Sequence, residues 1–261
     1  MRQDSNAYII GFATAVCLVC SIVVSTSAVA LRERQDRNKV LDRQTQVLVV
    51  AVLLEADQKA SAEEVENLFA QNIKIRAIDL ESGEYEDSIE SSTYDQRKAT
   101  KDPSSSRTAP DNNAGLTRLP TYALVYQRVE DDTVKSLILP IEGKGLWSTL
   151  YGFIALAPDT TTIQGITFYE HGETPGLGGE VDNPSWKALW VGRYAYDEDW
   201  APAIEVIKGV AGPVAEDPYH VDGLSGSTLT ARGVTNLVQF WLGENGFDPF
   251  LEKLRAEGAS S

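Results

Sequence analysis

The chain has 261 residues, of which 43% are hydrophobic and 23% charged, so it is long enough for one domain with an ordinary core plus an appended segment. Its 23 Lys and Arg residues against 38 Asp and Glu residues give a net charge of −15. Nucleic-acid binding needs clustered positive charge, so this balance excludes nucleic acid as a partner.

The chain opens with a long uncharged stretch from Tyr8 to Leu31. About 20 mostly apolar residues in a helix are enough to cross a bilayer. We therefore predict a transmembrane helix over residues 8–31, preceded by a short stub of residues 1–7. A cleavable signal peptide is the alternative, because Ala28-Val29-Ala30 resembles a cleavage site, but the apolar stretch is longer than such a peptide usually has.

The only two cysteines of the chain, Cys17 and Cys20, lie inside this stretch. Within an apolar helix they are interpreted as small hydrophobic residues. The rest of the chain therefore has no disulfide and no thiolate to hold a metal.

Basic residues gather after the predicted helix, at Arg32, Arg34, Arg37, Lys39 and Arg43, whereas only Arg2 precedes it. By the positive-inside rule alone, this asymmetry places the large domain in the cytoplasm.

The region before residue 120 gives mixed signals. The apolar run from Val47 to Leu54 is too short to span a bilayer and predicts a buried helix or strand. Ser61 is expected to cap a helix over Ala62 to Asn72, and Ile73 to Leu80 alternates like a strand. Glu81 to Leu119 is rich in Ser, Asp and Pro and is expected to be a surface insertion that is at least partly irregular.

From Thr121 onward, β-branched and aromatic residues between turn signals predict strands. An apolar face at helical spacing predicts a helix from Thr230 to Leu242, ended by Gly243, and a short last helix is expected over Phe250 to Leu254. The fold class is therefore α+β, with one central sheet and a few packed helices. The expected strands are Tyr122 to Arg128, Val134 to Ile141, Leu150 to Leu156, Ile163 to Tyr169 and a short one over Ala203 to Lys208.

A turn rich in glycine and hydroxyl groups runs from Asp222 to Thr230, just before the predicted helix. Free N–H groups and the helix dipole make such a helix start a natural phosphate site, and glycines let the chain approach a ligand closely. Plain N-capping by Ser or Thr is the alternative interpretation.

Two further loops are candidates for ligand contact. Tyr169 to Glu180 follows a predicted strand and contains four glycines, so it can wrap around a flat ligand or simply form a tight turn. Gly143 to Ser148 lies between two strands, where Lys144 can reach a phosphate or remain solvated. The only histidines, His171 and His220, have no companion at metal-ligand spacing, so no metal site is predicted.

At these segments the sequence resembles the C subunit of the sodium-translocating NADH:quinone reductases. Ser225-Gly226-Ser227-Thr228, preceded by Asp222, is similar to the family's flavinylation signature Asp-x-x-Ser/Thr-Gly-Ala-Thr, with Ser227 in place of the usual Ala. The similarity extends over most of the chain. It includes Tyr94 to Lys98, Gly143 to Ser148, His171 to Glu180, and Trp241-Leu242-Gly243 with Gly246-Phe247.

The resemblance implies an electron-carrying subunit that bears FMN covalently, through a phosphoester on Thr228. The residues that the resemblance places at the cofactor are Asp222, Ser225, Gly226 and Ser227 in the signature and Glu173, Thr174, Gly176 and Leu177 along the ring. Lys208 and Ser225 are expected to lie nearer the phosphate. No catalytic residue is expected, because the flavin does the redox chemistry.

The resemblance also implies partners and a location. A flavin transferase attaches the group from FAD outside the cytoplasmic membrane, so residues 32–261 should form a periplasmic domain of a bacterial inner-membrane protein, with an FMN-binding core at about residues 140–245. This opposes the arginine count, but large domains can translocate regardless of flanking charge. Other subunits of the respiratory complex are expected partners, and ion passage must belong to them, because one span offers too few polar groups.

Two alternatives remain open from the sequence. The G subunit of the related ion-translocating ferredoxin:NAD reductases shares the signature and the Glu-Thr-Pro-Gly-Leu-Gly core. A membrane-anchored binding module without redox activity is the second.

Overall fold

A computed structural model describes residues 6–55 and 58–258 of the chain. Its first element is one uninterrupted helix, α1 (Asn6–Val50), which contains the predicted span. It continues beyond Leu31 because residues 32–50 contain no Gly or Pro to end it. Residues 47–50 of the apolar run are therefore the last turn of this helix, and residues 51–54 form the turn that follows it. The stub over residues 1–7 lies largely outside the described residues.

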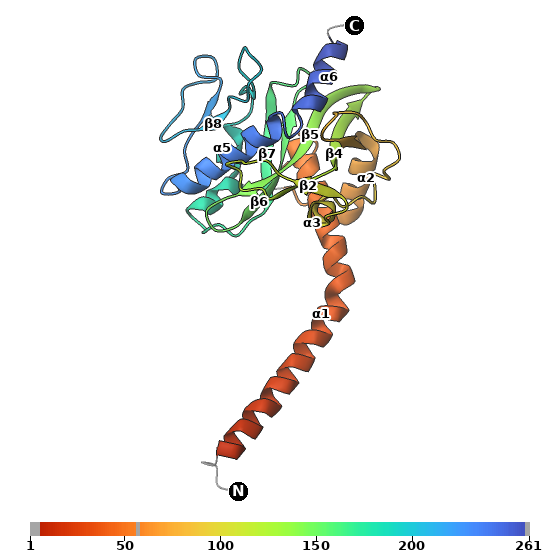
Figure 1. The fold of residues 1–261 in the computed structure, drawn as a ribbon, viewed down its shortest axis with the longest axis vertical. Helices are drawn as coiled ribbons and strands as arrows, with labels where there is room; N and C mark the ends of the chain where they lie inside the picture. Colours follow the sequence, from red (N-terminus) through yellow and green to blue (C-terminus); the bar gives the residue numbers. More distant parts are fainter. Residues whose placement is uncertain (1–5, 56–57, 259–261) are drawn as a thin grey trace. The chain divides into compact units, whose positions relative to one another are not determined.

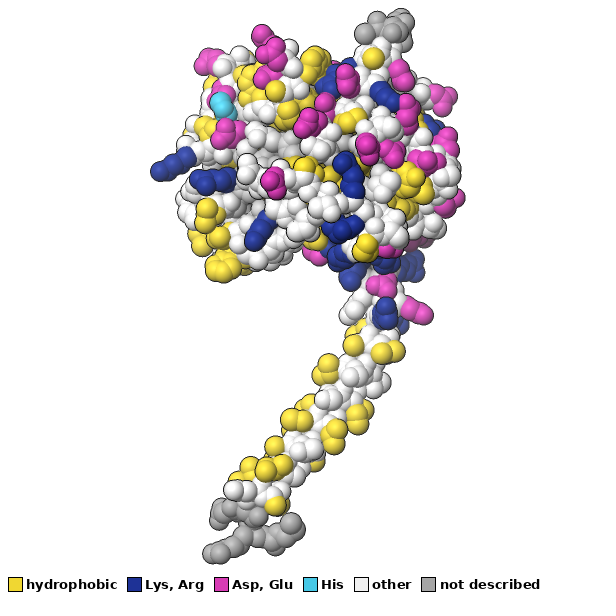
Figure 2. Space-filling view, viewed as in Figure 1, with side chains coloured by type: hydrophobic (Ala, Val, Ile, Leu, Met, Phe, Trp, Pro, Cys, Tyr) yellow, Lys and Arg dark blue, Asp and Glu magenta, His cyan; other side chains and the backbone are white. Residues whose placement is uncertain are grey.

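The surface of α1 divides along its length. Figure 2 shows apolar side chains on the exposed first part of the helix, followed by the basic cluster after Leu31. Within the described residues this is the one helix long and apolar enough to cross a membrane.

The next two predicted elements are confirmed. Helix α2 (Ala62–Asn72) begins with a capping box, in which the Ser61 hydroxyl accepts from the Glu64 amide and the Glu64 carboxylate accepts from the Ser61 amide. Strand β1 (Ile73–Asp79) follows it directly.

The core of the domain is a five-stranded antiparallel sheet in the order β1-β4-β5-β6-β7 (Figure 1). The four strands predicted after Thr121 are its last four members. Their bounds are β4 (Tyr122–Glu130), β5 (Thr133–Lys144), β6 (Thr149–Leu156) and β7 (Ile163–Glu170).

Helix α5 (Thr228–Leu242) lies across one face of the sheet, as Figure 1 shows. Val234, Leu237 and Trp241 are fully buried against it, which follows from their helical spacing. The helix begins two residues earlier than predicted, at Thr228, and Gly243 ends it as expected.

The opposite face of the sheet is covered by α2 and the last turn of α1. Phe69 of α2 meets Tyr126 edge to face, with ring centroids 6.3 Å apart. Gln46 of α1 accepts a 2.7 Å hydrogen bond from buried Thr167. The soluble domain is therefore a sheet between helices, and the predicted α+β class is confirmed.

Short elements fill the remaining segments. The predicted strand over Ala203 to Lys208 is wrong apart from Glu205 and Val206, because the amides of Ala203 and Ile204 both turn back to the Ala195 carbonyl. The insertion between residues 81 and 119 has more order than expected. The elements are α3 (Gln96–Lys101), β2 (Ser106–Thr108), β3 (Arg118–Pro120), the 3-10 helix η1 (Gly178–Asp182), α4 (Pro184–Ala188), β8 (Glu205–Val206), β9 (His220–Val221) and α6 (Asp248–Gly258).

Candidate functional site

The fold brings the three segments singled out in the sequence together at the start of α5. The Glu173 carboxylate, from the glycine-rich loop, binds the Trp147 amide of the β5–β6 loop and the Thr230 hydroxyl of α5. A Cβ on Gly226 would lie 3.0 Å from a methyl carbon of Leu177. These contacts place the hydroxyl-rich turn beside the glycine-rich loop.

The four hydroxyl residues at the start of α5 differ in how far they are buried. Ser227 is only 5% exposed and Thr230 is fully buried, whereas Ser225 and Thr228 are exposed. Ser227 is the N-cap residue, but its side chain makes no capping hydrogen bond. Thr228 is therefore an exposed hydroxyl residue at the first helical position, where backbone N–H groups have no partner within the helix.

The glycine-rich loop has an exposed edge beside the hydroxyl-rich turn. Its turn is closed by the Thr174 carbonyl, which accepts from the amides of Leu177 and Gly179. Gly176 has φ of +74°, a backbone conformation that favours glycine, and a Cβ there would meet no neighbour within 4 Å. Thr174, Gly176 and Leu177 are exposed.

Glu173 is placed differently from its neighbours in the loop, since its carboxylate is buried and points into the protein. It accepts hydrogen bonds from the amides of Leu146, Trp147 and Ser148 and from the Thr230 hydroxyl. Burial acts to raise the pKa of Glu173, but the hydrogen bonds from Thr230 and the three amides outweigh it and hold the pKa below its usual value.

Apolar side chains are exposed around the same helix start. Trp147 is 71% and Leu177 44% exposed, and Leu146 and Leu229 are also exposed. Leu146 and Leu229 line a cavity of about 220 Å³ together with Lys144 and Arg232. Large exposed apolar groups beside cationic ones suit a ligand with a flat apolar part and an anionic part.

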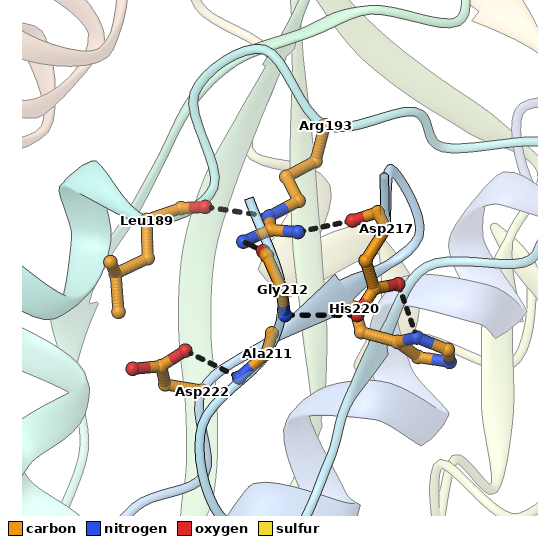
Figure 3. Close-up of polar contacts among 7 residues, drawn as sticks. All are labelled: Leu189, Arg193, Ala211, Gly212, Asp217, His220 and Asp222. Carbon is orange, nitrogen blue, oxygen red and sulfur yellow. Dashed lines mark hydrogen bonds and ion pairs between the residues drawn. The ribbon is translucent and has the colours of Figure 1, made fainter. Parts of the chain in front are cut away.

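Asp222 is held in a network that organises the segment before the signature (Figure 3). Its carboxylate accepts from the Ala211 amide at 2.9 Å, and its carbonyl accepts from the Trp186 indole at 2.8 Å. The buried Arg193 guanidinium donates to the carbonyls of Leu189, Gly212 and Asp217. Asp222 thus holds the backbone at Ala211 beside the signature.

Lys208 lies on the exposed loop after β8. The residues on either side of it contact the signature: Gly223 donates to the Gly209 carbonyl at 2.8 Å, and a Cβ on Gly223 would collide with the Ile207 carbonyl. The structure therefore brings the Lys208 backbone next to the signature turn.

Each histidine pairs with one carboxylate. His171 Nε2 lies 2.7 Å from Asp182, and His220 Nδ1 lies 2.6 Å from Asp217. Across residues 6–55 and 58–258, no group of three His, Cys, Asp or Glu side chains is arranged to hold a metal ion.

Sequence reasoning missed the roles of three residues of this region. Arg193 binds carbonyls 19 and 24 residues further along the chain, and Thr230, although it lies in the hydroxyl-rich turn, binds Glu173, which is 57 residues away; no local pattern signals these contacts. Trp147 lies in a segment that the sequence singled out, and a tryptophan in a short polar turn was the available signal for an exposed aromatic group.

Comparison with known proteins matches this region to a family. Residues 145–243 match the family model described as "FMN-binding domain". The chain is 47% identical over 257 residues to the C subunit of a Na(+)-translocating NADH-quinone reductase of Pseudomonas aeruginosa, covering 97% of this chain and 98% of that protein. The identity to the same subunit of Vibrio vulnificus is 48% over 258 residues, with 98% of both chains covered.

A solved structure supports the same relationship. NqrC of Shewanella oneidensis superposes with a TM-score of 0.76 at 34% identity, covering 85% of this chain and 99% of that one. The fold and the matched region together define a protein of the FMN-binding domain class. More particularly, the chain belongs to the family of C subunits of the Na(+)-translocating NADH-quinone reductases, as the sequence resemblance indicated.

Proposed function

We propose that this chain carries FMN covalently on the Thr228 hydroxyl and passes electrons within a sodium-translocating NADH:quinone reductase. Its membership of the C-subunit family and its FMN-binding domain support a flavin-bearing oxidoreductase subunit. The attachment point and the electron relay are inferred from the site.

The observation that carries the proposal is the position of Thr228. Thr228 is exposed at the first position of α5, while the neighbouring Ser227 and Thr230 are buried. A phosphodiester formed there would retain one negative charge, which unpaired N–H groups and the helix dipole stabilise. The residues present therefore fit a phosphate-linked group.

The surrounding residues suit the other parts of the molecule. Ser225 and Gly226 flank the phosphate position, and Lys208 adds positive charge on the adjacent loop. Thr174, Gly176 and Leu177, with Trp147, offer an open and largely apolar surface for the ring. When bound, FMN supplies the redox chemistry, and the protein tethers and orients it.

The proposal includes a topology. Residues 8–31 would cross the bacterial inner membrane, and residues 32–261 would face the periplasm, with the FMN-binding core at about 140–245. The long apolar helix supports a membrane anchor. The periplasmic side follows from the flavin transferase, which would act on Thr228 outside the cytoplasm. Partners would be this transferase and the other subunits of the reductase.

The two alternative functions are less well supported. The relatives at 47–48% identity over nearly the whole chain carry the name of the C subunit of the NADH-quinone reductases, which disfavours the G subunit of the ferredoxin:NAD reductases. A binding module without redox activity would lose any bound yellow colour on denaturation, whereas a covalent flavin would remain with the chain.

Intact-mass measurement of the protein purified from its native membrane tests the proposal. An added mass of one FMN minus one water is expected. A protein at its unmodified mass would contradict covalent attachment.

A further inference from the structure

The buried Glu173 carboxylate joins three segments of the site. Oε1 accepts from the amides of Trp147 at 2.9 Å and Ser148 at 3.2 Å. Oε2 accepts from the Leu146 amide at 3.3 Å and from the Thr230 hydroxyl at 2.7 Å. One side chain thus connects the glycine-rich loop, the β5–β6 loop and the first turn of α5.

These four bonds occupy the acceptor capacity of the carboxylate. Each carboxylate oxygen has two lone-pair directions, and each here receives two donors. The Glu173 carboxylate therefore has no lone pair left to offer a bound ring. The expected contact of Glu173 with the ring would therefore have to use its backbone or its methylene groups.

The backbone at Gly145 and Gly178 packs closely against the Glu173 carboxylate. A Cβ on Gly145 would lie 2.6 Å from Oε1, and a Cβ on Gly178 would lie 2.7 Å from Oε2. Because four hydrogen bonds hold the carboxylate, it cannot easily move aside. The two glycines thus let both loops close around it.

His171 holds the main chain of Glu173 from the other side. The Glu173 amide lies 3.2 Å from His171 Nδ1 in a hydrogen bond. His171 Nε2 lies 2.7 Å from the Asp182 carboxylate, so both ring nitrogens have a partner. The Gly172 amide donates to the Ser148 hydroxyl at 2.6 Å, which adds a second link between the two loops.

We propose that Glu173 is a positioning residue, which sets the environment of the flavin by holding exposed Leu146 and Trp147 at a fixed place relative to Thr228. The inference rests on the proposed attachment at Thr228. Trp147 is mostly exposed, so its backbone bond to Glu173 supplies positioning that side-chain packing does not.

Glu173→Gln tests the role in the membrane-purified complex. The substitution keeps the shape but replaces one acceptor oxygen with an NH₂ donor, which must face N–H or O–H donors in either orientation. We expect the FMN adduct to remain by intact mass, while the flavin's midpoint potential and visible absorption maximum shift from the wild-type values.

Glu180→Gln is the matched control. Glu180 lies in the same loop, but its carboxylate accepts from the Asn183 side chain and binds neither of the other segments. Its potential and spectrum should equal those of the wild type.

A second pair keeps the test decisive if Glu173→Gln does not fold. Thr230→Val removes one of the four donors with no change of shape, and should shift potential and spectrum in the same direction. Thr230→Ser restores the hydroxyl and should return both to wild-type values.

The outcomes separate the two proposals. A wild-type protein without an adduct overturns the attachment on Thr228 itself. With the adduct present, an unchanged potential and spectrum in Glu173→Gln or Thr230→Val overturns the positioning role, as does an equal shift in Glu180→Gln. Loss of the adduct in folded Glu173→Gln also overturns it, because Glu173 would then act in attachment.

Discussion

At the scale of single residues, accessibility distinguishes the hydroxyl groups of the signature better than their chemistry does. Ser227 and Thr228 are adjacent and both carry an alcohol, yet Ser227 is 5% exposed and Thr228 is open to solvent. Ser227 also occupies the position where the resembled signature has Ala. A hydroxyl there is thus a tolerated addition at a buried cap position.

We expect Ser227→Ala to retain the full FMN adduct, because the attachment does not use this hydroxyl. Since the Ser227 side chain makes no capping hydrogen bond, the cost in unfolding free energy should be near the lower end of the usual range of about 0.5–2 kcal/mol for N-cap replacement. Intact mass and thermal unfolding measure both. Loss of the adduct in the folded variant would make Ser227 the attachment residue.

The lowered pKa of Glu173 gives the protein a defined pH response. A carboxyl whose folded pKa lies below its unfolded value contributes stability above the unfolded pKa and loses it as the pH falls through the folded pKa. This contribution should therefore be complete at neutral pH and disappear in acid below the ordinary glutamate range.

We expect Glu173→Gln to lower the unfolding free energy at pH 7 by about 1–3 kcal/mol, since buried donors lose their charged acceptor. The difference from wild type should shrink as the pH falls, because wild-type Glu173 then becomes protonated. Denaturant titrations at pH 7 and under acid conditions measure it. A difference that grows in acid would show that Glu173 does not have a lowered pKa.

At the scale of elements, local composition and spacing predict the sheet and the main helix well. The β-branched and aromatic residues of β4 to β7 and the apolar face of α5 are local properties of the sequence, and the structure confirms the four strands and the helix. The Glu173 contacts could not be predicted in this way. Thr230 lies 57 residues away along the chain, and the amides of residues 146–148 carry no side-chain signal.

The close packing of α5 on β5 depends on Gly233, where a Cβ would lie 2.5 Å from the Lys144 carbonyl oxygen. Replacing an interior helical glycine by alanine normally stabilises by roughly 0.5–1 kcal/mol. Here the collision is with backbone, so the sign should reverse.

We expect Gly233→Ala to destabilise the domain by about 1–3 kcal/mol, the usual cost of overpacking. Gly258→Ala in α6 is the control, because a Cβ there meets no atom within 4 Å, and it should leave stability unchanged or slightly higher. Chemical denaturation compares the two. A stabilised Gly233→Ala would show that α5 is not held against Lys144.

At the scale of the whole molecule, the charge pattern and the proposed chemistry disagree about sidedness. The basic cluster after Leu31 favours a cytoplasmic domain, whereas attachment by an external transferase requires a periplasmic one. We propose the periplasmic side, because Thr228 lies in the large domain and must be accessible to the transferase that would modify it.

Labelling in whole cells resolves the sidedness. In a background with Cys17 and Cys20 replaced by Ala, exposed Ala215→Cys should react with a membrane-impermeant thiol reagent in intact cells. Asn6→Cys, before the predicted span, is the matched control and should react only after lysis. The reverse pattern would place the domain in the cytoplasm, as the arginine count indicates.

Peptide mapping of the membrane-purified protein by tandem mass spectrometry is the sharpest test of attachment at Thr228. We expect one FMN phosphoryl group on Thr228 in the wild type, and its complete loss in Thr228→Val, which keeps the shape of the side chain but has no oxygen for the ester. An FMN group on Ser225, Ser227 or Thr230, or one that persists in Thr228→Val, would contradict this assignment.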